Sequence, residues 1–207
     1  MLIWRRFKNK VISLPIITKN HTIMATKLLS NESLQRALTK EAWEELFSYF
    51  EWTESMLEKY QDKVDWDKIS DNENIHWTVP MIRKFQNKIN WDNFSENIDP
   101  ELLNEKLIGE FQDKWNWHKI SDCNFNYVKN ADKLLMKFAN KWDWRVIIKN
   151  NWYEPLFENK GIEFYEKYKD YIPEYEISDT YLWKEMVSQV KDQIIKEITT
   201  EDNDKRI

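Results

Sequence analysis

The sequence predicts an all-α fold, a right-handed α-solenoid of alternating short and longer helices with capping helices at both ends. The main observation is a short sequence motif that occurs four times and ends at Trp66, Trp91, Trp117 and Trp144. These tryptophans lie 25, 26 and 27 residues apart. A repeat of about 25–27 residues is typical of stacked two-helix units, each too small to bury its own apolar face. The chain also has twelve tryptophans to bury and only two glycines, which disfavours tight hairpins and glycine-lined phosphate loops.

The first helix of each unit is expected to begin at the repeated tryptophan. The residue before it can accept hydrogen bonds from the free amide groups of the first turn, as an N-cap does. These caps are Asp65, Asn90, Asn116 and Asp143. Asparagine tolerates the left-handed conformation that ends helices, so each first helix is expected to be short and to stop near the position of Asn72.

A second, longer helix is expected after each first one, for example at about residues 77–88. Met81, Ile82 and Phe85 have the spacing of an apolar helical stripe, and Pro80 fits only a helix that begins near residue 78 or 79. The buried core of the repeats is therefore predicted to contain nine aromatic residues. They are Trp66, Trp91, Trp117, Trp144, Trp52, Trp77, Phe85, Phe111 and Phe138.

The start of the chain is expected to divide into two parts. Residues 1–23 are basic and are expected to form a flexible leader, or an extension upstream of a start at Met24. A single helical-repeat domain then extends over residues 24–198. Ser30 and Thr39 are candidate caps of its first helix.

The end of the domain departs from the repeat pattern, as capping elements do. The clear repeats cover about residues 43–150, and a degenerate repeat follows at about 151–173. Ser178 is expected to cap a final helix over about 179–198, and residues 199–207 are expected to be a frayed tail. The inward-facing residues of that helix would be Leu182, Met186, Val190, Ile194 and Ile198.

The repeat unit resembles tryptophan-rich tandem repeats with the pattern D/N-W-x-x-I-S-x-N, which occur in proteins of bacteria and giant viruses. The match covers about residues 43–172 and is carried by the D/N-W phrase, the Ser-x-Asn stop and the Phe/Tyr-x-D/N-Lys turn. The layout is also similar to that of leucine-rich variant repeats, in which a short and a longer helix alternate. Cys123 replaces the asparagine of the stop in the third unit. The resemblance implies a helical-repeat fold and carries over no catalytic residue.

The composition favours an acidic protein of the cytoplasm. All 36 acidic residues fall within residues 32–207, which contain 25 basic ones. An acidic body repels phosphate backbones, so nucleic-acid binding is not expected. The single cysteine, Cys123, excludes an internal disulfide and fits a reducing compartment. No apolar run is long enough to cross a bilayer, and Pro15 and Lys19 distinguish the apolar stretch 11–17 from a signal peptide.

Four aromatic residues form the candidate partner-binding site: Trp115, Trp142, Trp152 and Tyr153. Trp115 and Trp142 stand two places before the repeated tryptophans, where the first two units have valine and isoleucine. Equivalent positions lie close together in a stack, so these two side chains would form one patch, which Trp152 and Tyr153 extend. Exposed tryptophan pairs are favoured interface anchors. A wider core at this end of the protein explains the same residues, so both interpretations stay open.

No catalytic, metal or cofactor site is expected. The three histidines are scattered, and none stands in an H-x-x-x-H frame for zinc. His118 and Cys123 lie too close in the sequence for the long-range layout of a thiol hydrolase. The lysines of the repeated turn, which aspartates flank, are interpreted as solvated residues rather than an anion track. They are Lys63, Lys88, Lys114 and Lys141.

Stacked helix pairs present recurring positions on an extended surface, which suits non-covalent binding of another macromolecule. The leading hypothesis is a non-catalytic protein–protein interaction module that binds a basic protein partner, for example as an inhibitor or an immunity-type protein. An alternative is a structural subunit that associates with copies of itself through the ends of its stack. A third hypothesis is a helical-repeat enzyme or nucleic-acid binder.

Overall fold

The computed structural model describes residues 30–204, with side chains from residue 30 to 199, and this part of the chain is all-helical, without a strand. The leader expected at residues 1–23 lies outside the described residues. The chain divides into two units, one that ends at Glu44 and one that begins at Glu45. The boundary falls within the first helix, α1 (Glu32–Tyr49), and the tryptophan repeats lie in the second unit.

Helix α1 begins one residue after its cap, Asn31. The Asn31 side-chain oxygen accepts a hydrogen bond from the backbone N–H of Leu34 at 3.0 Å. The prediction that Ser30 or Thr39 caps this helix is wrong. Thr39 lies inside α1, where its hydroxyl donates to a carbonyl of the preceding turn, as threonine hydroxyls in helix interiors do.

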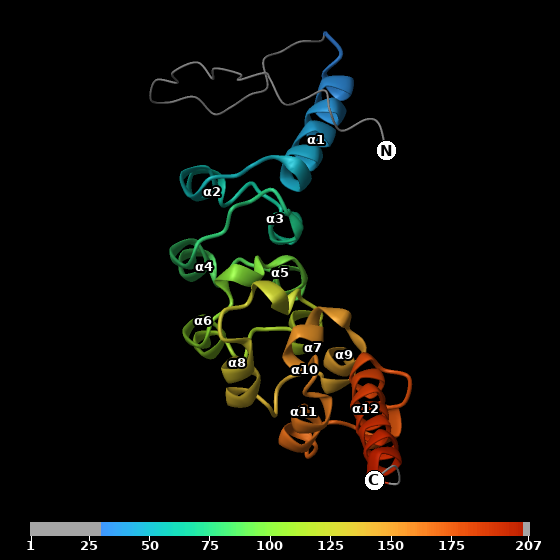
Figure 1. Cartoon of the computed structure of the whole chain (residues 1–207). Helices are drawn as coiled ribbons and strands as arrows, with labels where there is room; N and C mark the ends of the chain where they lie inside the picture. Colours follow the sequence, from blue (N-terminus) through green and yellow to red (C-terminus); the bar gives the residue numbers. More distant parts are fainter. Residues whose placement is uncertain (1–29, 205–207) are drawn as a thin grey trace. The chain divides into compact units, whose positions relative to one another are not determined.

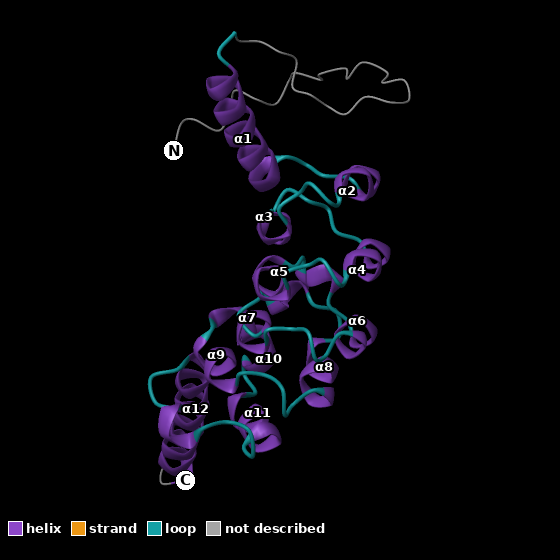
Figure 2. Ribbon diagram, turned by 180° about the vertical axis from the view of Figure 1, so that it is seen from behind, coloured by secondary structure: helices purple, strands orange, loops and turns teal. Residues whose placement is uncertain are grey.

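The first helices of the units form one row, in which each helix lies beside the next (Figures 1 and 2). This first row consists of α3 (Trp66–Asp71), α5 (Trp91–Asn97), α7 (Trp117–Ile120) and α9 (Trp144–Lys149). Each helix begins at the repeated tryptophan. The predicted N-caps are confirmed, because their side chains accept hydrogen bonds from amide groups of the first turn. They are Asp65, Asn90, Asn116 and Asp143.

The second helices form another row beside the first (Figure 1). This second row consists of α2 (Glu54–Tyr60), α4 (Val79–Phe85), α6 (Glu105–Glu110), α8 (Ala131–Lys137) and α11 (Gly161–Tyr168). Pro80 lies in the first turn of α4, as predicted. Ion pairs between neighbouring helices link the row. They join Lys84 to Glu54, Arg83 to Glu110, Lys137 to Glu105 and Lys167 to Asp132.

The expected alternation of short and longer helices holds in three of the four units. The first and second helices have 6 and 7 residues in α3 and α4, 4 and 7 in α7 and α8, and 6 and 8 in α9 and α11. It is wrong for α5 and α6, which have 7 and 6 residues. The second helices are shorter than expected because they end at the repeated Phe or Tyr or one residue before it, and the Lys turn that follows is not helical. Short helical turns occupy the later connections. They are η1 (Pro100–Leu102), η2 (Phe125–Tyr127), η3 (Asn151–Tyr153) and α10 (Glu154–Phe157).

Each repeated tryptophan connects its own unit to the next one. Trp144 is buried, whereas the prediction that Trp66, Trp91 and Trp117 are buried is wrong, because these three stay half-buried at the edge of the stack. Its indole N–H donates to the backbone carbonyl five residues earlier, at Gln61, Gln86, Gln112 and Ala139, over 2.7–2.9 Å. Its ring lies against an aromatic ring of the following second-row helix. The centroid distances are 5.2 Å for Trp66–Phe85, 4.8 Å for Trp91–Phe111, 5.9 Å for Trp117–Phe138 and 4.7 Å for Trp144–Tyr168.

The last helix, α12 (Tyr181–Asp204), follows a short turn, η4 (Glu174–Glu176). Its cap is Thr180, whose hydroxyl oxygen accepts from Trp183 N at 3.1 Å. The predicted cap, Ser178, lies before the true start because Asp179 has a φ of 65° and interrupts the helical path. Helix α12 packs closely on α11, since a Cβ added at Gly161 would lie 3.0 Å from the Met186 backbone nitrogen.

Helix α12 continues to Asp204, past its predicted end at residue 198. Leu182 is fully buried against the preceding helices and Met186 is half-buried. The expectation that Val190, Ile194 and Ile198 also face inward is wrong. All three are exposed, because they lie on the same side of α12 as the exposed Trp183 and Val187, beside the face that packs on the preceding helices.

Candidate protein-binding face

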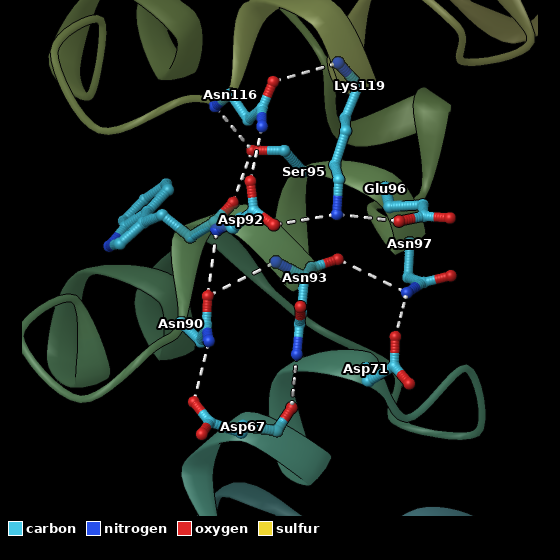
Figure 3. A network of polar contacts seen from close by, with 11 residues as sticks. Asp67, Asp71, Asn90, Asp92, Asn93, Ser95, Glu96, Asn97, Asn116 and Lys119 are labelled. Atoms are coloured by element: carbon cyan, nitrogen blue, oxygen red, sulfur yellow. Dashed lines mark hydrogen bonds and ion pairs between the residues drawn. The ribbon is translucent and has the colours of Figure 1, made fainter.

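A buried serine bonds each first-row helix to the next. Ser95 in α5 is fully buried, and its hydroxyl donates to the Trp91 carbonyl of its own helix. The same oxygen accepts the backbone N–H of Asn116, the cap of α7, at 3.0 Å (Figure 3). Ser70 and Ser121 make the equivalent bonds at the junctions before and after. The serine at each junction therefore provides a hydrogen-bond acceptor for the backbone N–H of the next helix's cap. This bond fixes the spacing of the two units.

A second bond at each junction joins the residue after the repeated tryptophan to the cap of the next helix. Asn90 Nδ2 donates to Asp67 Oδ1 at 2.7 Å, and Asn116 makes the same bond to Asp92 (Figure 3). The third junction uses different residues. His118 stands in the position of the aspartate, and Asp143 stands in the position of the asparagine. His118 Nδ1 lies 2.8 Å from Asp143 Oδ2. The interaction is kept although both of its partners differ.

Ion pairs and amides extend the contacts along the exposed side of the first row. Lys119 Nζ lies 2.9 Å from both Asp92 Oδ2 and Glu96 Oε2, and the hydrogen bond from Lys119 lowers the pKa of the Asp92 carboxyl (Figure 3). Asn97 Nδ2 donates to Asp71 Oδ1 at 2.8 Å. These carboxylates stay exposed on successive helices. We call this surface the junction face, and its exposed acidic residues are Asp67, Asp71, Asp92, Glu96 and Asp122.

Two open cavities lie at the C-terminal part of the junction face, and His118 and Asp122 line both. The first cavity, of about 710 Å³, is also lined by Asp143, Arg145 and Glu176. Its other lining residues are Val146, Lys149, Asn150, Asn151 and Tyr181. The second cavity, of about 600 Å³, adds Glu73 and Glu96 from earlier units, and Trp152. Carboxylates therefore line both cavities, together with Arg145 and Lys149 in the first and Lys119 in the second.

Exposed aromatic residues border these cavities. Tyr175 is 77% exposed, and its hydroxyl oxygen accepts from Arg145 Nη2 at 2.9 Å. Tyr181 lines the first cavity and Trp152 lines the second, and each is 39% exposed. We call Trp152, Tyr175 and Tyr181 the aromatic rim. Trp, Tyr and Arg are the residues that most often dominate the binding energy of protein interfaces.

Three of the four predicted partner-binding residues are not on the surface. Trp115 and Trp142 are each 5% exposed, and Tyr153 is fully buried, with its hydroxyl donating to the Ser121 carbonyl at 2.7 Å. Of the four, only Trp152 is available to a partner. Trp115 and Trp142 replace residues that are themselves buried, Val64 and Ile89 in the first two units. The interpretation as a wider core therefore describes Trp115 and Trp142.

The two buried tryptophans differ from the repeated ones in their polar contacts. The indole N–H groups of Trp115 and Trp142 make no hydrogen bond within the described part of the chain. Each ring stands edge-to-face on a repeated tryptophan, with centroid distances of 4.8 Å for Trp115–Trp91 and 4.9 Å for Trp142–Trp117. Aromatic contacts of this geometry are favourable and offset part of the cost of an unbonded donor.

Sequence reasoning missed Arg145, Tyr175 and Tyr181. Tyr175 and Tyr181 lie after the last clear repeat, where no equivalent position in another unit marks them. A signal for Arg145 was present: it follows a repeated tryptophan, where the first two units have aspartate. The change from an acidic to a basic residue reflects a different partner, because Arg145 pairs with Glu176 at 3.1 Å.

Cys123 is buried, and burial raises the pKa of its thiol far above the ordinary value. A thiol in this state is a poor nucleophile at neutral pH, since the thiolate is the reactive form. Among residues 30–199, no three His, Cys, Asp or Glu side chains are grouped so that they could hold a metal ion.

Three of the four lysines of the repeated turn contact neighbouring units. Lys88 lies 3.4 Å from Asp62, and Lys141 lies 3.8 Å from Asp113. Lys114 donates to the Gln86 carbonyl at 3.0 Å. In these contacts a carboxylate or carbonyl oxygen faces each ammonium group. These three lysines therefore do not form an open anion track.

No protein-family model matches this sequence, and neither a curated protein nor a solved structure matches it. Over the described residues, no helix combines the length and the apolar composition that a membrane span requires.

Proposed function

We propose that this protein is a non-catalytic helical-repeat module, a right-handed α-solenoid, that binds a basic protein partner. The junction face and the aromatic rim form its binding surface. An inhibitor or an immunity-type protein is one form that such a module takes. The observation that carries the proposal is the combination of exposed carboxylates on successive helices with exposed Trp, Tyr and Arg side chains around the two cavities.

The two parts of this surface have different physical roles. Carboxylates that recur on α3, on α5 and in the turn after α7 attract a cationic surface at long range, which raises the association rate and fixes the register. Aromatic side chains at the rim can bury large apolar areas against a partner, which lowers the dissociation rate. Lys119 and Arg145 reduce the negative charge locally, so the attraction is strongest for a partner whose basic groups meet Asp67, Asp71 and Asp122.

The test has two stages, with the full chain as bait. Proteins retained from a lysate of the source cells are identified by mass spectrometry, and the dissociation constant of the purified partner is then measured. We expect a basic protein whose affinity falls at least about tenfold in the double variant Trp152→Ala/Tyr175→Ala, since truncated interface anchors cost about 2 kcal/mol or more. We also expect its association rate to fall as the salt concentration rises from about 50 to about 300 mM.

The matched control is Tyr49→Ala, which removes an exposed tyrosine of α1 that lines neither cavity. This variant should keep the wild-type affinity. The proposal fails if the retained partner is acidic, or if the rim variant and the control bind it equally well.

A further inference from the structure

The second cavity of the junction face is more acidic than the first. Its described lining contains three carboxylates and one ammonium group, that of Lys119, so its formal charge is −2 with His118 neutral. The described lining of the first cavity contains three carboxylates and two basic side chains, a formal charge of −1. There, Glu176 is already paired with both Arg145 and Lys149. A cation is therefore attracted more strongly to the second cavity.

Two of the carboxylates in the second cavity have free acceptor oxygens. Glu73, in the turn after α3, makes no side-chain hydrogen bond or ion pair with the described residues. Asp122 accepts a hydrogen bond from Asn150 Nδ2 at Oδ1, over 2.7 Å, and its Oδ2 has no partner among the described residues. Glu96, in contrast, is paired with Lys119 (Figure 3). A ligand with N–H donors can therefore bond Asp122 without displacing a contact of the protein.

Asn150 fixes the position of Trp152 relative to Asp122. Its Nδ2 donates to the Asp122 carboxylate, and its Oδ1 accepts the backbone N–H of Trp152 at 2.9 Å. One amide group therefore holds the η3 turn beside the carboxylate. The side chain of Trp152 lines the same cavity and is exposed. An indole ring and a carboxylate with a free oxygen are thus brought to the same part of the cavity by two successive units.

This combination fits a guanidinium group better than it fits other cations. A guanidinium is flat, so it can stack on an indole ring while its edge donates hydrogen bonds to a carboxylate. A lysine ammonium is a point charge and has no flat surface to stack. The cavity lining also contains Ile98 and Pro100, which suit the apolar stem of an arginine side chain.

We propose that the second cavity is an arginine site, which binds an arginine side chain of the basic partner. The guanidinium stacks on Trp152 and donates to Asp122 Oδ2, and the negative charges of Glu73 and Glu96 add to the attraction. This proposal rests on the proposed function, because the arginine belongs to the partner. It goes further in naming the side chain that is recognised and the place where that side chain binds.

The test uses the full chain and synthetic pentapeptides whose central residue, between glycines, is arginine, lysine or citrulline. Citrulline has the shape of arginine without its charge. Proton–nitrogen correlation NMR follows the indole N–H signal of Trp152, which is the signal missing from the Trp152→Phe variant. We expect a saturable shift of this signal with the arginine peptide and no shift with the citrulline peptide. The lysine peptide should bind at least about threefold more weakly than the arginine peptide.

A variant of the carboxylate tests the site from the side of the protein. Asp122→Asn keeps an acceptor for Asn150 but removes the charge, so it should weaken binding of the arginine peptide at least about threefold. Glu163→Gln is the matched control, because Glu163 is an exposed acidic residue of α11 that lines neither cavity, and it should bind as the wild type does.

Three results would overturn the proposal. They are an unchanged Trp152 signal up to the solubility limit of the arginine peptide, equal binding of this peptide and either of the other two, and equal affinities of Asp122→Asn and Glu163→Gln. A basic partner that is retained although the arginine peptide does not bind removes only the arginine site. A peptide that binds when no basic protein is retained supports the arginine site and counts against the proposed function.

Discussion

Ser70, Ser95 and Ser121 show how much one small side chain contributes to the contact between units. Each hydroxyl donates to its own helix and accepts from the backbone of the next cap. Serine is normally unfavourable inside a helix because its hydroxyl competes for backbone groups. Here the same hydroxyl donates to a carbonyl of its own helix and accepts an N–H of the next unit, so its bonds to backbone groups link the two units.

Replacing Ser95 by alanine should lower the free energy of unfolding by about 1–3 kcal/mol, because the Asn116 N–H is then left without its acceptor. Urea denaturation monitored by tryptophan fluorescence measures this change. Ser178→Ala, at an exposed serine before α12, is the control and should change the free energy by less than about 0.5 kcal/mol. Equal effects of the two substitutions would show that the junction bond contributes nothing.

At the residue scale, the sequence predicted the caps of the first-row helices but not those of α1 and α12, nor which tryptophans are exposed. Asp65 and Asn90 act as caps because cap preference depends on a few neighbouring residues. Exposure depends on what packs from other units. Trp115 and Trp142 have the composition of an interface patch, yet each is buried by rings from its own and the preceding units. Sequence spacing alone does not contain that information.

The contacts between first-row helices vary while their geometry is kept. Helices α3 and α5 are joined through an aspartate and an asparagine, and so are α5 and α7. Helices α7 and α9 use His118 and Asp143 in the same places. A change on one helix is thus matched by a change on its neighbour.

This matching can be tested by a double-mutant cycle. His118→Asp alone brings two carboxylates together and should lower the free energy of unfolding by about 0.5–1 kcal/mol. Adding Asp143→Asn recreates the pair found at the other two junctions, and should restore most of the loss. Thermal unfolding of the two single variants and the double variant gives the interaction energy. Additive effects would mean that the two residues are independent.

At the element scale, the starts of helices were easier to predict than their ends or their packing. Starts depend on local caps and on Pro80, whereas the second-row helices end where the repeated turn begins, earlier than the apolar stripe suggested. The apolar residues of α12 follow a regular helical period but do not all face the core. Periodicity identifies an apolar face without identifying what covers it.

For the whole molecule, the carboxylates that pair between units predict how its stability depends on pH. Hydrogen bonds from Arg83 and Lys149 lower the pKa values of Glu110 and Glu176 below their ordinary value of 4.5. Because the folded state favours the ionised forms, their contribution to stability is complete above about pH 4.5 and is lost as the pH falls through the lowered values.

We therefore expect the urea midpoint to be constant near neutral pH and to fall below about pH 4.5. Arg83→Met should be less stable than the wild type at pH 7, and this difference should shrink towards zero in acid, where Glu110 is protonated. Urea titrations across the pH series measure both effects. A difference between the two proteins that does not change with pH would exclude an electrostatic origin.

The serine and cap contacts also bear on how such a chain can change its length. Each bond links a residue of one block to the matching residue of the following block, so loss of the block 91–116 would leave both flanking blocks with suitable neighbours. Lys119 would then meet Asp67 and Asp71, which are again carboxylates. Unequal crossing-over in the gene could therefore shorten or lengthen the protein by whole blocks with the first-row contacts kept. In the second row, Arg83 would then meet Lys137 in the place of Glu110, and this pair would need a compensating change.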